Sequence, residues 1–202
     1  VSDRSALAQM YVNVARVHVQ RGELDEADIS LRRAEDLFRE MELKHEIGVA
    51  RLARGLTLSR QGELDLARDH LVSAIRTFAG SKDEVESANA RAELARVARL
   101  QGRLDEARSL LETAIETLRR KHDPHILAWA HRELAFCWTE LDPPVAEKNL
   151  RAAIELYEST GEAVELATTY RALGDLLHEQ GDDRGGCEAY RTGIVTVERL
   201  YG

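Results

Sequence analysis

The chain has 202 residues, of which 44% are hydrophobic and 5% aromatic, and its net charge is −8 at pH 7. A surface that binds nucleic acid has to neutralise phosphates, so this acidic balance argues against direct nucleic-acid binding. The sequence has no apolar run of about 18 residues and no basic-then-apolar start, and its only cysteines are Cys137 and Cys187. It therefore predicts neither a membrane span nor a signal peptide, and favours a reduced, cytoplasmic protein.

One short motif returns along the chain at a fixed step. The segment GELDEA at 22–27 recurs as GELDLA at 62–67 and as GRLDEA at 102–107, which is a period of 40 residues. A fixed period of this length is typical of repeat architectures. An apolar-periodic segment lies on each side of every motif, so its glycine marks a tight turn between two antiparallel helices.

The period predicts five helix-turn-helix repeats that fill a single domain, 1–202. Their expected bounds are about 5–44, 45–84, 85–124, 125–163 and 164–202. In the third repeat we expect helices at roughly 86–101 and 104–120, preceded by a helix stop at Gly80 and a capping box at 81–84. The fourth turn lacks the glycine, but Asp142 can cap the next helix and Pro143 suits its first position.

Three positions in each repeat are always Ala or Gly. They lie seven residues before the turn glycine (Ala15, Gly55, Ala95, Ala135, Gly174), five after it (Ala27, Ala67, Ala107, Ala146, Gly186) and twelve after it (Ala34, Ala74, Ala114, Ala153, Gly193). Small residues at fixed points let two helix backbones approach closely. Larger apolar residues between them are expected to fill the core, namely Leu31, Leu71, Leu111, Leu150 and Tyr190 in second helices and Val14, Leu94, Leu134 and Leu173 in first helices.

This pattern resembles the tetratricopeptide repeat (TPR) family. The residues that carry it are Tyr170, Leu173, Gly174, Gly181, Gly186 and Tyr190 in the last repeat, and Tyr11, Val14, Ala15, Gly22, Ala27, Leu31 and Ala34 in the first. The resemblance implies an all-α, right-handed α-α superhelix. The chain departs from the common pattern in its period of 40 instead of 34 residues and in Arg51, Arg91 and His131, which replace aromatic residues. Longer repeats are similar to those of TPR-like domains in bacterial transcription regulators and peptide receptors.

The resemblance also implies a concave surface lined by the first helix of each pair. Carried over by register, the ligand-binding residues would be Asn13, Arg16, Asn89, Arg96, Trp129, Arg132, Phe136, Arg171 and Asp175, with Val12, Leu52, Leu56, Arg99 and His178 beside them. Arg can bind carboxylates bidentately, Asn can bind a peptide backbone, and the two aromatic residues could form an apolar pocket. We expect the Arg residues to make the surface locally positive, so that it attracts an extended anionic peptide. The alternative for each residue is a solvated or internally paired side chain.

Candidate catalytic and metal-binding residues are few. His122 and His125 flank Pro124, but a metal site needs three or four ligands and only Asp123 lies beside them, which favours a structural loop. Cys137 as a nucleophile would need a base, and His131 lies on nearly the opposite side of the same helix. We interpret Cys137 as a packing residue. No phosphate-binding motif occurs, so we expect neither an enzyme nor a cofactor nor a metal site.

Two functions of different classes fit this sequence. The first is a protein- or peptide-binding module that forms the sensor part of a larger bacterial transcription regulator. The second is a stand-alone scaffold that recruits other proteins without switching. We also expect Ile194, Val197 and Leu200 to be partly uncovered, and therefore a homodimer through the C-terminal repeat. The sequence identifies neither the ligand nor the partner.

Overall fold

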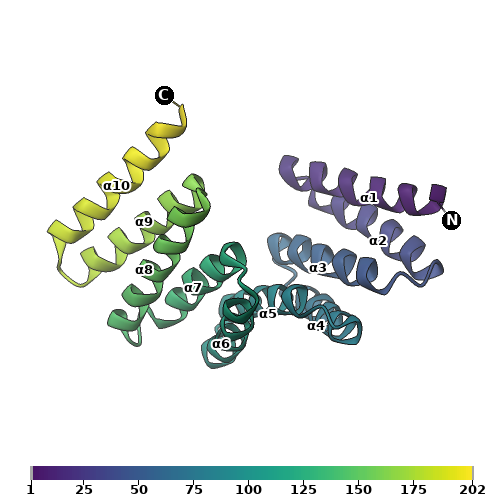
Figure 1. The fold of residues 1–202 in the computed structure, drawn as a ribbon, viewed down its shortest axis with the longest axis horizontal. Helices are drawn as coiled ribbons and strands as arrows, with labels where there is room; N and C mark the ends of the chain where they lie inside the picture. The colour runs from purple at the N-terminus through teal and green to yellow at the C-terminus, as the bar shows by residue number, and fades with distance from the viewer. Residues whose placement is uncertain (1, 202) are drawn as a thin grey trace. The chain divides into compact units, whose positions relative to one another are not determined.

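The computed structural model describes the backbone of residues 2–201 and the side chains of residues 3–199. Over that part of the chain it contains ten α-helices and no strand, which confirms the predicted all-α architecture (Figure 1). The helices are α1 (Ser2–Arg21), α2 (Leu24–Glu40), α3 (Lys44–Gln61), α4 (Leu64–Ser81), α5 (Glu84–Leu100), α6 (Leu104–Lys121), α7 (Pro124–Trp138), α8 (Pro143–Thr160), α9 (Ala163–Glu179) and α10 (Asp183–Tyr201). They form the five predicted helix pairs.

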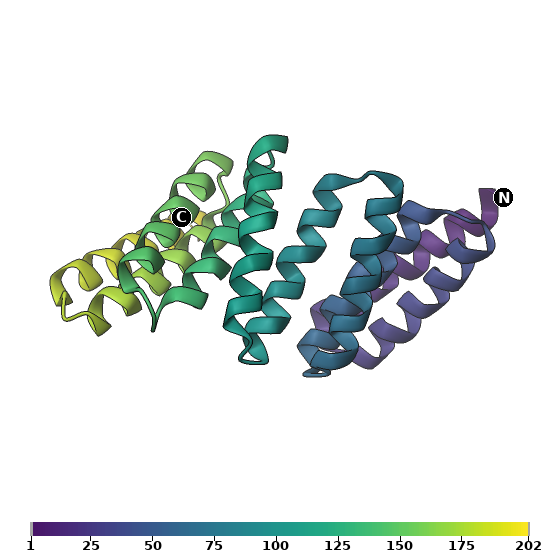
Figure 2. The same ribbon diagram turned by 90° about the horizontal axis from the view of Figure 1, so that it is seen from below.

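The helices are grouped in two compact units. Unit 1 extends to Glu106 and unit 2 begins at Ala107, so the division falls near the start of α6. In unit 1 each helix from α1 to α4 packs against the next one along the chain, and in unit 2 the same holds from α7 to α9 (Figure 2). The handedness of a superhelix through both units stays a prediction.

The turns within the repeats follow the expected chemistry. At the end of α3, Gly62 has φ of 85°, a left-handed conformation that glycine adopts without steric cost. This lets the N–H of Glu63 donate to the carbonyl of Leu58 at 3.0 Å. In the fourth turn the carboxylate of Asp142 accepts the N–H of Val145 at 3.2 Å, and Pro143 is the first residue of α8. The prediction for the turn without glycine is therefore confirmed.

The boundary before the third repeat differs from the prediction. Gly80 and Ser81 both belong to α4, and Lys82 adopts the left-handed conformation that ends this helix. The cap of α5 is Asp83, whose carboxylate accepts the N–H of Glu86 at 3.2 Å. The predicted helix stop at Gly80 and the capping box from Ser81 are wrong, because Asp83 lies directly before α5 and its short side chain reaches the N–H three residues on.

The small-residue positions are the points of closest helix contact. All fifteen are buried. At Gly174 of α9 an added Cβ would lie 2.4 Å from the ring of Tyr190 in α10, and at Gly193 it would lie 3.2 Å from the carbonyl oxygen of Ala167. The glycines of the last repeat therefore let α9 and α10 approach more closely than alanine would allow.

Val14 is the predicted core residue that the structure places on the surface. Its side chain is 44% exposed, whereas Leu94, Leu134 and Leu173 are buried at the same register position. In those repeats the position faces the second helix of the preceding repeat. No described helix precedes α1, so the prediction for Val14 is wrong.

The same register position in α3 is occupied by an arginine that lies inside unit 1. Arg54 donates from Nε to Asp28 at 2.8 Å and from Nη1 to Glu35 at 3.0 Å, and both carboxylates are buried on α2. Arg51 donates from Nε to Glu35 at 2.8 Å and from Nη1 to Thr77 of α4 at 3.0 Å. This buried ion cluster joins α2, α3 and α4, and it explains why Arg51 replaces the usual aromatic residue.

Burial alone would raise the pKa of the Asp28 and Glu35 carboxyl groups. Hydrogen bonds outweigh it, from Arg54 and Arg32 to Asp28 and from Arg51 and Arg54 to Glu35, so both pKa values lie below their ordinary range. Each carboxyl therefore binds its proton more weakly in the fold than in the unfolded chain. The resulting stability is present above the ordinary carboxyl pKa of about 4 and is lost as the pH falls through the folded values.

Substituting Gly174 tests the close approach of α9 and α10. We expect Gly174→Leu to lower the free energy of unfolding by about 1–3 kcal/mol, because the new side chain collides with the Tyr190 ring. The matched control is Gly80→Leu in the last turn of α4, where an added Cβ meets nothing within 4 Å. Urea denaturation measures both. An equal loss at the two positions would contradict the packing described here.

The buried ion cluster predicts a second pair of outcomes. Glu35→Gln should destabilise the protein by about 3 kcal/mol, because Arg51 and Arg54 lose a buried counter-charge. Glu40→Gln, which removes only a surface ion pair with Arg4, should cost less than about 1 kcal/mol. A variant that replaces all four charges of the cluster, Asp28→Leu, Glu35→Ile, Arg51→Leu and Arg54→Leu, leaves none of them unpaired, and it should be neutral or stabilising by up to about 4 kcal/mol. A quadruple variant as unstable as Glu35→Gln would show that the charges themselves hold α2 and α3 together.

Candidate functional site

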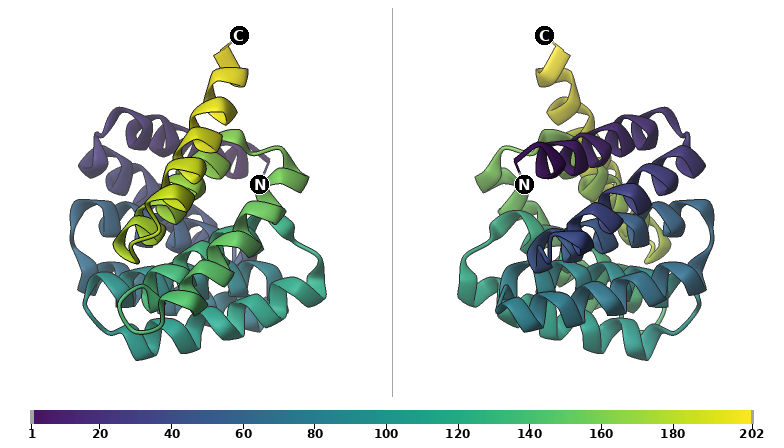
Figure 3. Two further views of the ribbon diagram at one scale, coloured as in Figure 1. Left: turned by 90° about the vertical axis from the view of Figure 1, so that its left-hand side faces the viewer. Right: turned by 90° about the vertical axis from the view of Figure 1, so that its right-hand side faces the viewer.

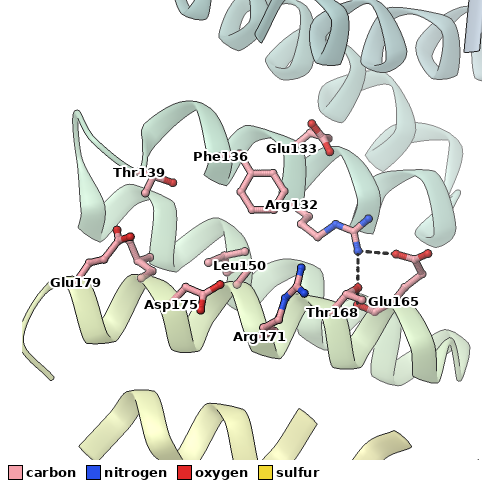
Figure 4. Close-up of a pocket in the computed structure, with 12 residues that line it drawn as sticks. Arg132, Glu133, Phe136, Thr139, Leu150, Glu165, Thr168, Arg171, Asp175 and Glu179 are labelled. Carbon is pink, nitrogen blue, oxygen red and sulfur yellow. Dashed lines mark hydrogen bonds and ion pairs between the residues drawn. The ribbon is translucent and has the colours of Figure 1, made fainter. Parts of the chain in front are cut away.

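A pocket of about 440 Å³ opens between α7, α8 and α9 in unit 2. Its walls come from α7 and α9, with Leu150 of α8 between them (Figure 4). The lining residues are Arg132, Glu133, Phe136, Thr139, Leu150, Glu165, Thr168, Arg171, Ala172, Asp175, Leu176 and Glu179. Four predicted ligand-binding residues meet here, namely Arg132, Phe136, Arg171 and Asp175.

Arg132 is fixed at one end of this pocket. Its Nη1 donates to the carboxylate of Glu165 at 2.5 Å and to the hydroxyl of Thr168 at 3.1 Å, both on α9. The guanidinium also lies 5.8 Å from the ring centroid of Tyr157, within the range of a cation–π contact. Tyr157 is buried, and burial raises the pKa of its phenol. Arg132 is thus a hydrogen-bond donor held in a fixed position, and it is already paired with the carboxylate of Glu165.

Arg171 is placed differently. It rises from α9 toward Phe136 and Arg132 (Figure 4), and among the described residues it has no hydrogen bond or ion pair. One turn further along α9, Asp175 accepts a hydrogen bond from the hydroxyl of Tyr190 at 2.8 Å, and this bond raises the pKa of the Tyr190 phenol. Glu179 follows after another turn. The spacing puts a free cation and two carboxylates along about 12 Å of one helix face.

The charge of this pocket differs from the prediction. Its lining contains two arginines, Arg132 and Arg171, but four carboxylates. The expectation of a positive concave surface does not hold for this pocket, because first-helix carboxylates share the face with the arginines. Phe136, which is 36% exposed, and Leu150 supply apolar surface between the charges. The pocket therefore suits a ligand that carries both signs of charge and an apolar group.

Unit 1 has a smaller pocket of about 240 Å³ among α1, α2 and α3. It is lined by Val12, Ala15, Arg16, Val19, Leu31, Ala53, Leu56, Thr57 and Arg60. The structure thus brings together three residues that the register had grouped, Val12, Arg16 and Leu56. Asn13 lies beside them without lining the pocket, and its side-chain oxygen accepts a hydrogen bond from Arg16 at 3.3 Å.

The remaining predicted residues lie outside both pockets. Asn89 and Arg96 of α5 pair within their own helix, with Glu86 and Glu93 respectively. Trp129 is half-buried on α7, one turn before Glu133. The ligand-binding role of Asn89 and Arg96 stays a prediction.

Sequence reasoning missed several residues of the unit 2 pocket. Thr168 and Glu179 are separated from Arg171 and Asp175 by three and four residues, so they share the same face of α9. Thr139 extends the face of Arg132 and Phe136 on α7 in the same way. Helical spacing from the predicted residues could have found all three. Glu165 could have been found too, but its pairing with Arg132 depends on how α7 and α9 pack.

The residues considered for chemistry are placed as follows. His122 lies in a turn with φ of 57°, and His125 contacts the carboxylate of Glu162 at 2.6 Å. Cys137 is buried and Cys187 is exposed.

Within residues 3–199, no three His, Cys, Asp or Glu side chains come together as metal ligands. No described helix has both the length and the apolar character of a membrane span.

Comparison with family models identifies the repeats. Models described as tetratricopeptide repeat match three segments in succession, residues 8–40, 48–72 and 86–159. The chain belongs to the tetratricopeptide repeat family. The matched segments of this TPR protein cover four of its five helix pairs in whole or in part. No curated protein is similar enough in sequence to be matched.

Solved structures show the same fold as this TPR chain. BtubC (BKLC) from P. vanneervenii is 17% identical with a TM-score of 0.83, over 98% of this chain and 83% of that one. A Rap protein complexed with competence and sporulation factor is 14% identical with a TM-score of 0.85, over 95% of this chain and 54% of that one. The Rap conjugation gene regulator of plasmid pLS20, in complex with the Phr* peptide, is 13% identical with a TM-score of 0.81, over 94% and 53%. The TPR chain therefore spans about half the length of these Rap proteins, and the likeness confirms an all-α repeat solenoid.

Proposed function

We propose that this chain is a protein- or peptide-binding module, and that the unit 2 pocket receives a short segment of its ligand. The observation that carries the proposal is Arg171, an unpaired guanidinium in a pocket of about 440 Å³ between two first helices. The volume falls within the usual range of ligand pockets, about 300–1,000 Å³. The Rap structures, one with competence and sporulation factor and one with the Phr* peptide, support a peptide as the ligand.

The lining specifies the chemistry of that segment. An acidic group of the ligand would bind Arg171, and a basic group would lie four to eight residues further along α9, near Asp175 and Glu179. An apolar side chain between them would contact Phe136 and Leu150. A segment with alternating charge therefore fits this pocket better than a purely acidic one, which four carboxylates would repel.

Substitution of Arg171 tests the site. With a peptide obtained by display selection, Arg171→Ala should weaken binding about tenfold to hundredfold, since a hydrogen bond to a charged group is worth about 1.5–3 kcal/mol. Asp175→Asn should also weaken the binding of a segment with both charges, whereas it would strengthen the binding of a purely acidic one. Isothermal titration calorimetry measures both affinities.

The control for this experiment is Arg151→Ala on α8. Arg151 pairs with Glu147 of its own helix and lies away from the pocket. Arg108 is unsuitable, because its guanidinium lies 4.5 Å from the Trp138 ring centroid and donates to the carbonyl of Cys137. Equal affinity losses for Arg171→Ala and Arg151→Ala would rule out the pocket as the binding site.

We also propose that the module is the sensor part of a larger bacterial transcription regulator, as the sequence analysis expected. The likeness to a Rap conjugation gene regulator supports this role. Hydrogen exchange with and without the peptide distinguishes a sensor from a stand-alone scaffold. A sensor changes amide protection in helices that do not line the pocket, such as α1 and α2, whereas a scaffold changes it only in α7, α8 and α9.

A further inference from the structure

A hollow of about 750 Å³ opens in unit 1 between α2 and α4, the second helices of the first two repeats. Helix α3 packs against both of them (Figure 3), and its last turn contributes Leu58 and Gln61 to the lining. The volume falls within the usual range of ligand pockets, about 300–1,000 Å³. This α2–α4 hollow shares no residue with the pocket among α1, α2 and α3 or with the unit 2 pocket.

Two large apolar side chains face water in the α2–α4 hollow. Ile29 of α2 is 49% exposed and Leu66 of α4 is 51% exposed. At the position of Ile29 the other repeats carry Asp69, Ser109, Lys148 and Glu188, and at the position of Leu66 they carry Glu26, Glu106, Val145 and Gly185. The repeat fold therefore requires neither residue. Single exposed apolar residues are ordinary, but two that line one hollow form a patch, and such patches mark interaction sites.

A carboxylate lies about one helical turn from each of these apolar residues. On α2, Asp25 precedes Ile29 by four residues, and at the start of α4, Glu63 precedes Leu66 by three. Helices α2 and α4 run in the same direction, because short turns make both of them antiparallel to α3. The two walls thus present the same order, a carboxylate beside the turn and an apolar group one turn further on.

These two carboxylates have no cation beside them. Asp25 accepts a hydrogen bond from the side-chain amide of Gln61 at 2.6 Å, which holds it in place. Among the described residues the side chain of Glu63 has no hydrogen bond or ion pair. Arg32, which also lines the hollow, is paired with Asp28 at 2.7 Å. The α2–α4 hollow is therefore an apolar patch with two carboxylates that lack a counter-charge.

The equivalent place one repeat later is occupied by the protein's own charges. There Glu106 stands at the position of Leu66, and Arg68 donates to it at 2.6 Å. Arg103, at the position of Glu63, contacts the same carboxylate at 3.4 Å. The repeat can thus satisfy these positions internally. In the first two repeats it leaves both the apolar patch and the negative charge open to a partner.

We propose that the α2–α4 hollow docks a segment of a partner protein that carries a large apolar side chain close to a lysine or arginine. The apolar group contacts Ile29 and Leu66, and the cation binds the carboxylates beside the turns. In the ligand the two groups are about 6 Å apart, as for side chains four residues apart in a helix or two apart in an extended segment. The net charge of −8 favours the approach of such a basic segment.

This site is separate from the two other binding expectations. It shares no residue with the unit 2 pocket, so it does not rest on the function proposed for that pocket. The homodimer expected through the C-terminal repeat also stays a separate prediction. Ile194 is 57% exposed there, and the side chain of Leu200 lies outside the described residues.

A subtractive peptide selection tests the α2–α4 hollow. A displayed library of random peptides is selected on the unaltered chain and depleted on the variant Ile29→Ser with Leu66→Gln, which removes the apolar patch and keeps both carboxylates. Other repeats carry polar residues at these positions, so circular dichroism should show unchanged helix content. The retained peptides should carry a large apolar residue two or four positions from a lysine or arginine.

Fluorescence anisotropy with one retained peptide then tests the charges. Asp25→Asn with Glu63→Gln should weaken binding at least about fourfold, because the cation of the peptide loses its partners. The matched control, Glu26→Gln with Asp69→Asn, makes the same change of charge on α2 and α4 outside the hollow, and should change the affinity less than about twofold.

Arg171→Ala in the unit 2 pocket should leave the affinity for this peptide unchanged, which separates the two sites. The proposal is overturned if no peptide is retained after depletion, or if the retained peptides are acidic or lack a cation. Equal losses for the hollow variant and its matched control would overturn it as well, because they indicate only a general attraction to an acidic protein.

Discussion

The close approach of helix backbones at the Ala and Gly positions is the constraint on which the rest of this structure depends. Where Gly174 faces the ring of Tyr190, and where Gly193 faces the Ala167 carbonyl, no larger residue fits without movement of a neighbour. This fixes which face of each first helix is turned inward. The adjacent face, three residues before and one residue after Ala135 and Gly174, then carries Arg132, Phe136, Arg171 and Asp175, so the packing constraint places the pocket residues beside the helix contact.

One register position shows how the same fold tolerates different chemistry. Leu94, Leu134 and Leu173 fill it with apolar side chains, Val14 leaves it exposed, and Arg54 brings a charge into the core. The charge is compatible with burial because Asp28 and Glu35 on α2 accept its hydrogen bonds. A buried ion pair contributes little net stability compared with apolar residues, but an unpaired partner is costly. The cluster therefore favours pairing of α3 with α2 over pairing with any other second helix of the chain.

The two arginines of the unit 2 pocket have different parts in its chemistry. Arg132 is held by Glu165, Thr168 and the Tyr157 ring, so little conformational entropy remains to be lost when it meets a ligand. Arg171 is unpaired and can offer its full set of donors. The last helix also reaches this site, since Tyr190 of α10 donates to Asp175.

The sequence by itself determined the repeat, its turns, the fifteen small buried positions and the helix face on which ligand contacts would lie, because these depend on helical periodicity and on residue size at fixed spacing. It did not determine side-chain pairing between helices. That Glu35 meets Arg51 and Arg54, that Glu165 occupies Arg132, and that Arg171 stays unpaired all depend on distances between helices that are far apart in the chain. Which pocket charges remain open to a ligand depends on the pairing of Arg132 with Glu165, so only the tertiary structure decided that.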